Sequence, residues 1–346
     1  MKRAIIILTV ILLMAVPAHG MEFTAPDAPK EALEYLPEDT QNFGEGLWFV
    51  IKSAVRTVKP ELAEASGVCV ALIAGSLMAG VLIGISGNMK SMIELAAGAI
   101  TTITLFQPMN SLIHLGVQTV TQVSQYGKLL LPVMTGAMAA QGGVTKSGAL
   151  YAATAAFDAL LSGGISSLLV PLVYLYLGFS IAGNLFPQVL IKNIQKFLKW
   201  LITWILKTLL YIFTGYISIT GVVGGATDAA VLKATKLTIS GMIPVVGNIL
   251  SDASEAVLVS AGLMKNAAGI YGLLTIIALW IGPFLQIGVQ YLMLNITSGI
   301  CEIFGTKQMT EIIKDFSSAM GLLLAMTGAV CMIFVISTIC FMKGVG

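Results

Sequence analysis

The sequence of 346 residues is 57% hydrophobic and only 10% charged, whereas about a quarter of the residues in a soluble domain are charged. With a formal net charge of only +2, neither a soluble globular domain nor a protein that binds nucleic acid is expected. The apolar residues form blocks close to the roughly 20 residues that a helix needs to cross a bilayer. These features predict an all-α, polytopic membrane helical bundle.

The first 20 residues are typical of a cleavable signal peptide. Two basic residues precede the apolar run Ala4–Val16, and Ala18 and Gly20 place small residues where a signal peptidase cleaves. An uncleaved anchor helix is the alternative, but it would need a longer apolar run. We therefore expect residues 1–20 to be removed, so that the chain after them begins outside the cytoplasm.

Residues 21–67 form an acidic extracytoplasmic segment with four bases and nine acids, a net charge of −5. From Leu47 to Val58 apolar residues recur at helical spacing and three bases lie on another face, which predicts an amphipathic helix that ends at Pro60. This helix could lie in the lipid headgroup layer with Trp48 as an anchor, or it could pack on a partner. The sequence alone does not separate the two.

The remainder of the chain, residues 68–346, is predicted to form a multi-pass membrane domain. Six long apolar blocks have the length of membrane spans. They cover residues 68–87, 97–118, 165–190, 200–224, 270–297 and 318–342.

Two stretches between these blocks, residues 129–162 and 237–269, are of a different kind. Each contains two shorter apolar pieces separated by a small or polar turn, at 141–143 in one and at 251–255 in the other. A helix of about 13 residues rises only about 20 Å, which is short of the hydrocarbon thickness. Each stretch therefore predicts a hairpin that enters the membrane and turns back. A proline-kinked helix inside a packed bundle is the alternative.

Prolines relate the two stretches. Pro132 and Pro244 are 112 residues apart, and so are Pro171 and Pro283. This spacing predicts an internal duplication in which each copy contains a span, a short hairpin and a span. The predicted copies cover about 97–190 and 200–297.

The hairpins supply the candidate functional residues. Lipid offers no partners to unpaired backbone groups, so a helix break at membrane depth needs protein or water to cover it, and broken helices recur at transport sites. For Asp252 and Glu255 a solvated turn tip is the simpler explanation, because ionisable groups in a membrane are costly unless solvated. The candidate hairpin and passage residues are Pro132, Gly136, Asp158, Asp228, Lys236, Pro244, Gly247, Asp252 and Glu255.

A basic linker between the predicted copies indicates the orientation. Lys192, Lys196 and Lys199 cluster there, and the positive-inside rule places such a short basic loop in the cytoplasm. Both hairpins then open toward the extracytoplasmic side, and the chain ends on that side after Lys343.

Motifs for enzymatic chemistry are absent from the sequence. It has no Walker loop, no His-Glu-x-x-His and no paired-cysteine metal motif. Gly84-Ile85-Ser86-Gly87 is similar to the Gly-x-Ser-Gly of rhomboid proteases, but a serine nucleophile needs a base within hydrogen-bond reach. The candidate base, His114, falls on a different predicted span. We expect no enzyme activity, no metal and no cofactor.

The run from 224 to 274 is more specific than any short motif. It contains Thr227-Asp228, Ile243-Pro244-Val245-Val246-Gly247, Ser251-Asp252-Ala253 and Leu263-Met264-Lys265-Asn266. In these segments the chain resembles the stage III sporulation protein AE family of endospore-forming bacteria, and the likeness continues more loosely from about residue 68 to Lys343. The segment before the first span is shorter than this family leads us to expect.

The resemblance implies a membrane subunit of the channel or secretion complex that connects the mother cell to the engulfed forespore. It implies a location in the outer forespore membrane, with the mature N-terminus facing the intermembrane space. The implied partners are the other stage III AA to AH proteins, including a secretion-type ATPase and ring-forming subunits, and forespore protein Q. The expected role is a permease-like subunit whose hairpins line a solute passage. The alternatives are a scaffold that recruits these subunits without conducting anything, and an autonomous transporter.

Overall fold

The computed structural model describes residues 24–37, 42–140, 144–186, 188–219 and 267–343. Within these ranges the protein is helical and has no strand, as the sequence predicts. Six of the described helices are long and apolar enough to cross a membrane. Each coincides with most of one predicted span, so the prediction of a polytopic helical membrane protein is confirmed.

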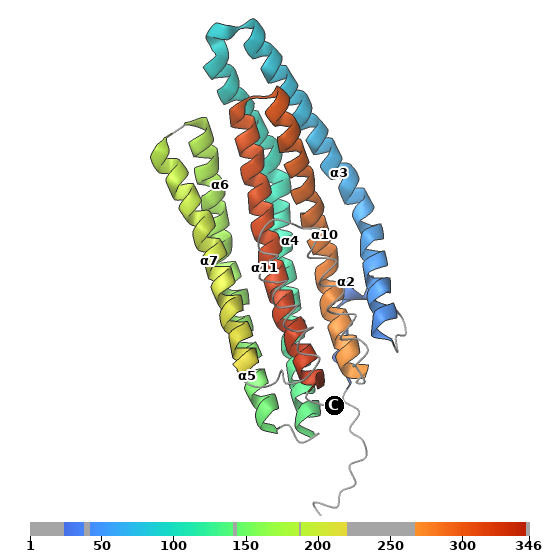
Figure 1. Cartoon of the computed structure of the whole chain (residues 1–346). Coiled ribbons are helices and arrows are strands. Elements are labelled where there is room, and N and C mark those ends of the chain that lie inside the picture. The colour runs from blue at the N-terminus through green and yellow to red at the C-terminus, as the bar shows by residue number, and fades with distance from the viewer. Residues whose placement is uncertain (1–23, 38–41, 141–143, 187, 220–266, 344–346) are drawn as a thin grey trace, which may run out of the picture.

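The described elements follow one another as antiparallel rods (Figure 1). The helices α5, η2 and α6 are continuous with one another. In chain order the elements are α2 (Lys30–Leu33), α3 (Phe43–Ile85), the 3-10 turn η1 (Gly87–Met89), α4 (Lys90–Ala140), α5 (Val144–Gly164), the π-helical turn η2 (Ile165–Leu169), α6 (Val170–Leu185), α7 (Val189–Ile219), α10 (Ala267–Phe304) and α11 (Lys307–Lys343).

Successive long helices run in opposite directions (Figure 1). The connections from α3 to α4, from α6 to α7 and from α10 to α11 lie at one end of the bundle, which we call the turn end. The start of α3, the end of α4, the start of α5 and the end of α11 lie toward the opposite end. This alternation is the one expected if each of the six described helices crosses the membrane.

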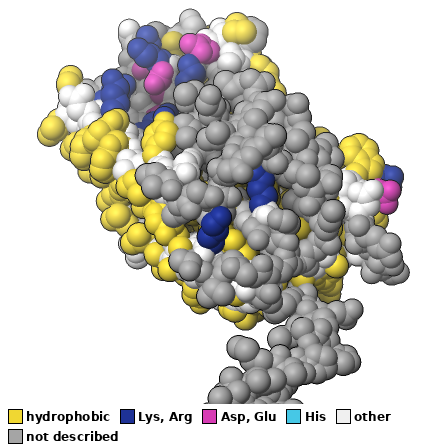
Figure 2. Space-filling model, turned by 60° about the horizontal axis from the view of Figure 1, so that its bottom comes forward, with side chains coloured by type: hydrophobic (Ala, Val, Ile, Leu, Met, Phe, Trp, Pro, Cys, Tyr) yellow, Lys and Arg dark blue, Asp and Glu magenta, His cyan; other side chains and the backbone are white. Residues whose placement is uncertain are grey.

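The helices α10 and α11 form the centre of the bundle. They pack on each other, α3 packs on α10, and α4 and α6 pack on α11. The most apolar part of α10 and of α11 is 78% buried, against 22% in α3 and 28% in α4 and in α7. A helix that is apolar on all sides belongs in a core, whereas the exposed apolar faces of α3, α4 and α7 suit contact with lipid. In Figure 2 hydrophobic side chains cover much of the visible flank, and charged side chains gather in small groups.

Glycines allow the closest helix contacts in this core. A Cβ atom at Gly127 of α4 would lie 2.1 Å from the ring of Phe334 on α11, and a Cβ atom at Gly272 of α10 would lie 2.6 Å from Leu130 on α4. Such separations are far below van der Waals contact. A hydrogen in place of a side chain is therefore what lets α4 approach both central helices, as small residues do in membrane bundles.

The predicted amphipathic helix and the first predicted span form one helix. α3 runs for 43 residues and contains Pro60, so the prediction that a helix ends at Pro60 is wrong. Proline removes one backbone hydrogen bond within a helix. Here Pro60 is exposed, and α3 packs on α10, so tertiary contacts hold the helix together across the break in its hydrogen-bond ladder.

The first predicted hairpin also differs from expectation. α4 runs for 51 residues through Pro108 and Pro132, so the span 97–118 and the first piece of the hairpin are one helix. The second piece continues through η2 into α6. The expectation of separate short helices is wrong, although α4 and α5 end and begin on either side of the predicted turn at 141–143.

The physical reason lies in the polar residues that follow the predicted second span. Val120, Val123 and Tyr126 alternate with polar residues there and are buried in the bundle. Burial of this stripe keeps α4 helical where the polar composition suggested a loop. Residues 220–266 lie outside the described residues, as does the signal peptide, so the second hairpin, the duplication and the cleavage site stay predictions.

The first described part of the acidic segment, residues 24–37, is packed into the bundle, and we call it the N-terminal segment. Ala32 and Tyr35 are buried, and the Tyr126 hydroxyl of α4 donates a hydrogen bond to the Pro26 carbonyl at 3.2 Å. α2, within this segment, contacts α10. The segment is therefore part of the helix bundle.

Candidate functional site

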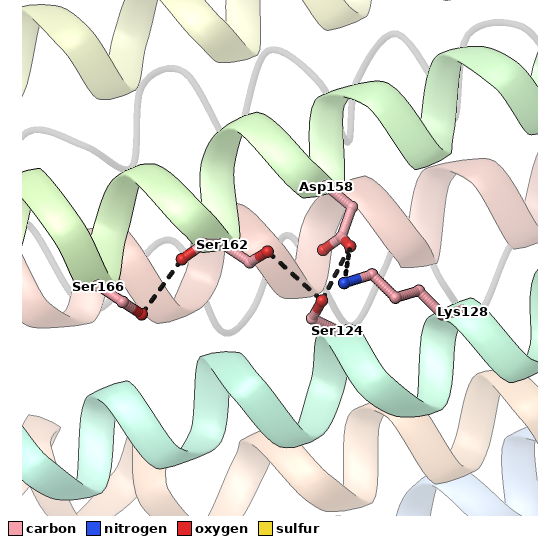
Figure 3. Close-up of polar contacts among 5 residues, drawn as sticks. All are labelled: Ser124, Lys128, Asp158, Ser162 and Ser166. Atoms are coloured by element: carbon pink, nitrogen blue, oxygen red, sulfur yellow. Dashed lines mark hydrogen bonds and ion pairs between the residues drawn. The ribbon is translucent and has the colours of Figure 1, made fainter.

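A buried carboxylate lies between α4 and α5. Asp158 on α5 is 1% exposed. The Ser124 hydroxyl on α4 donates a hydrogen bond to its Oδ2 at 2.8 Å, and the Lys128 ammonium lies 3.4 Å from the same oxygen (Figure 3). Residues four apart on a helix lie on one face, so one turn of α4 supplies both partners.

Serines extend this cluster toward the π-helical turn (Figure 3). The Ser162 hydroxyl lies 3.4 Å from that of Ser124, and the Ser166 hydroxyl donates to the Ser162 carbonyl at 3.2 Å. Asp158, Ser162 and Ser166 recur every four residues, so they form a polar stripe along the α5–η2 rod. Single π-turns inside α-helices occur often at functional sites.

The two oxygens of Asp158 are in different situations. Oδ2 has the ammonium and the hydroxyl, whereas Oδ1 is buried and has no hydrogen-bond partner among the described residues. The side chain of Lys128 is 54% exposed and that of Asp158 is fully buried, so the charge on the lysine reaches inward from the surface. The arrangement suits a carboxylate that can accept a proton or a further donor at Oδ1, since buried oxygens normally have partners.

The other candidates from the first hairpin lie on the same helix as Lys128. Pro132 follows one turn after Lys128, and Gly136 one turn later; both lie within α4. Pro132 is exposed and Gly136 is partly buried. The structure therefore brings Asp158 close to this part of α4. The remaining candidates lie outside the described residues, and their roles stay predictions: Asp228, Lys236, Pro244, Gly247, Asp252 and Glu255.

A second carboxylate, Asp315 on α11, is not among the candidates predicted from the sequence. Three donors from successive turns of α6 reach it: the Tyr176 hydroxyl at 3.2 Å, the Ser180 hydroxyl at 2.5 Å and the Asn184 amide at 2.9 Å. This cluster joins α6 to α11 near the turn end. The four-residue spacing of polar side chains within an apolar block was the signal that could have revealed the α6 half of it.

The structure does not bring together the residues of a protease. Ser86 follows the end of α3, whereas His114 lies 24 residues after the start of α4, which is about 36 Å along the helix axis. Among the described residues no group of three or more His, Cys, Asp or Glu side chains is placed to hold a metal ion. The described polar clusters are hydrogen-bond and ion-pair sites.

A bundle of six membrane-length helices with ionisable side chains buried between them defines a polytopic membrane protein. The family model described as Stage III sporulation protein AE matches residues 39–346. This chain belongs to that family, which confirms the resemblance found in the sequence.

One curated relative shows the extent of the similarity. The Stage III sporulation protein AE of Bacillus subtilis (strain 168) is 24% identical over 226 residues, which cover 65% of this chain and 56% of that protein. The match therefore spans little more than half the length of the relative. No solved structure matches this chain.

Proposed function

We propose that this protein is a permease-like membrane subunit of the sporulation complex that connects mother cell and forespore, and that it resides in the outer forespore membrane. Its family supports a role in sporulation, and its six apolar helices support the membrane location. The observation that carries the permease-like role is the buried Asp158, whose Oδ1 has no partner among the described residues.

The contrast between the Asp158 cluster, which is buried, and the Asp315 cluster, which is partly buried, is the argument for this choice. Asp315 receives hydrogen bonds from three donors of α6, as a carboxylate with a structural role should. Asp158 has one oxygen without a hydrogen-bond partner among the described residues. Ionisable groups inside a membrane are costly and commonly mark ion or solute pathways and proton relays, so Asp158 is the better candidate for a group that functions in transport.

In this proposal the passage runs beside the α4–α5 hairpin. Asp228, Lys236, Asp252 and Glu255, which lie outside the described residues, stay candidate passage residues. The partners would be the other stage III AA to AH proteins, including a secretion-type ATPase and ring-forming subunits, and forespore protein Q across the intermembrane space. The chain itself would carry out no enzymatic step.

Asp158→Asn tests this proposal, with Asp315→Asn as the matched control. The gene for each variant replaces the only copy of the gene in a sporulating host. The amount of the variant in the membrane and the expression of a late forespore reporter are then measured. We expect Asp158→Asn to accumulate normally and to lower reporter expression. Asp315→Asn should alter the amount of protein while leaving the expression per molecule unchanged. Normal expression at normal abundance in Asp158→Asn would overturn the permease-like role.

The exposed surface of α3 favours a second candidate function. Its apolar part is only 22% buried, and Lys52, Arg56 and Lys59 are exposed, as on a surface that binds other subunits. A scaffold would recruit the ring-forming and ATPase subunits through such a face without conducting anything. In that case Asp158→Asn should leave reporter expression unchanged, whereas deletion of residues 44–60 should prevent the partner subunits from assembling with this protein.

A further inference from the structure

One exposed side of α3 is basic in its first half and apolar in its second. Lys52, Arg56 and Lys59 are exposed and lie on one side of the helix because they are four and three residues apart. We call these three residues the basic stripe. None of them forms an ion pair within the described ranges. Further along the same side of α3, Val81 and Ile85 are also exposed.

Contacts between α3 and α10 place the basic stripe at the middle of an apolar helix. The two helices run in the same direction (Figure 1), and the Cys69 thiol lies beside the Thr297 hydroxyl. The stripe precedes Cys69 by 10 to 17 residues, so it is level with about residues 280–287 of α10. α10 has no charged residue from 267 to 301. The basic stripe therefore lies level with the centre of a charge-free stretch.

Tyr35 gives the same alignment independently. Its hydroxyl interacts with the side chain of Thr57, which lies within the length of the stripe, and it packs against Gly282 of α10. Residue 282 falls within the range that the Cys69 contact predicts.

The apolar half of α3 is also displaced toward the turn end. The Ser76 hydroxyl lies against Gly305, which connects α10 to α11, so residues 77–85 extend beyond that connection (Figure 1). Charged side chains gather at this end of the two central helices, namely Glu302, Lys307, Glu311 and Lys314. Both halves of α3 are thus shifted toward the turn end relative to the charge pattern of α10 and α11.

Two features do not fit an upright bundle, namely the basic stripe at the level of the apolar middle of α10 and the apolar tip of α3 beyond the α10–α11 connection. Tilting the bundle in the membrane accommodates both. A plane perpendicular to the axis would put the basic stripe in hydrocarbon, where charges are costly, and the apolar tip of α3 in water. The charge-free stretch of α10 spans 35 residues, which is about 52 Å long and exceeds the hydrocarbon thickness of about 30 Å. Long apolar helices accommodate such an excess by tilting.

We propose that the basic stripe binds the phosphate groups of phospholipid headgroups in the leaflet opposite the turn end, and that the bundle is inclined so that α3 lies closer to that leaflet than α7 does. Lys and Arg extend their charged ends to the phosphates while their stems cover apolar surface. Trp48 and Phe49, both exposed just before the stripe, are side chains of the type that gathers at membrane interfaces. This inference is independent of the passage proposed for Asp158.

α7 offers the matched position on the other side of the bundle. The Lys199 ammonium donates to the Ser318 hydroxyl at 3.0 Å, and α7 runs in the same direction as α11 (Figure 1), so Trp204 is level with Leu323. Leu323 and Ile287 both lie against Gly116. Trp204, which is exposed, is therefore level with Ile287 and with the end of the basic stripe.

The test compares the depths of two labels. Lys59→Cys and Trp204→Cys, made separately in the full chain, carry a nitroxide and are reconstituted into vesicles of phosphatidylcholine and phosphatidylglycerol. Accessibility to oxygen and to a nickel chelate reports the depth of each label. We expect the Lys59 label at the phosphates and the Trp204 label in the hydrocarbon, deeper by about half the hydrocarbon thickness of roughly 30 Å. Equal depths would overturn the proposal.

A third label keeps the proposal testable if one variant does not fold. Val81 lies beyond the α10–α11 connection. A nitroxide on Val81→Cys should therefore be in hydrocarbon if the bundle is inclined and in water if it is upright. A Lys59 label in bulk water or in hydrocarbon would show that the stripe does not lie at the phosphates, and would also overturn the proposal. Thermal unfolding of each unlabelled variant verifies that it is folded.

Discussion

The hydroxyl of Tyr35 packs against Gly282 so closely that a Cβ atom at residue 282 would lie 2.7 Å from the tyrosine oxygen. Tyr35 belongs to the N-terminal segment, and Gly282 lies in the middle of α10, next to Pro283. The contact ties the segment that follows the predicted signal peptide to a central helix. The N-terminal segment is therefore expected to contribute to the stability of the membrane domain.

Tyr35→Ala tests this contribution. Loss of a buried aromatic side chain leaves a cavity, and we expect a loss of about 3 kcal/mol in the free energy of unfolding, measured by denaturant titration in detergent. Leu33→Ala is the control, because Leu33 lies in the same segment and is 54% exposed. Equal effects of the two substitutions would show that the segment is not anchored through Tyr35.

The same tyrosine predicts a dependence of stability on alkaline pH. Burial raises the pKa of Tyr35 above its usual value, an effect that the Thr57 side chain partly opposes and the charge of Glu34 reinforces. Because the folded state holds the phenolic proton more tightly than the unfolded state, this contribution is present below a pH of about 10 and is lost as pH rises through the folded pKa. Tyr35→Phe should flatten the pH profile above 10, and an unchanged slope would contradict this.

Gly127→Ala should destabilise the contact between α4 and α11. The new methyl group would meet the buried ring of Phe334, and overpacking of a filled core costs about 1–3 kcal/mol. Gly148→Ala is the matched control, because no heavy atom lies within 4 Å of the Cβ position there. In α5 this control should be neutral or stabilising by up to about 1 kcal/mol. Thermal unfolding of both variants in detergent would reveal the difference, and equal melting temperatures would contradict it.

The ion pair between Lys128 and Asp158 should show strong coupling. Lys128→Met leaves the buried carboxylate without its counter-charge, and we expect a loss of about 2 kcal/mol in stability. This is less than the roughly 3–5 kcal/mol for a fully buried pair, because water partly replaces an exposed lysine. Adding Asp158→Asn removes the unpaired charge, so the double variant should be more stable than Lys128→Met alone. Additive losses in a double-mutant cycle would refute the coupling.

The structural features that the sequence did not predict depend on contacts between residues that are distant in the chain. Pro60 was predicted to end a helix, and the span 97–118 was predicted to be separate from the hairpin piece that contains Pro132, yet α3 and α4 are each continuous. In both helices, packing against a central helix maintains the helical path. The same dependence explains why Asp158 was found as a candidate while its partners on α4 were not, since a carboxylate near an apolar block is visible locally but its counter-charge is not.

The sequence by itself determined the number of membrane-length helices and the family, because each span must satisfy the bilayer with its own run of about 20 apolar residues. Such a requirement is local and is met segment by segment. Only the tertiary structure decided which helices are central, that Asp315 joins α6 to α11, and that the basic stripe of α3 is level with the apolar middle of α10. These features depend on the relative heights of helices that are far apart in the chain and on which of their faces meet. The hydropathy of the sequence does not determine either.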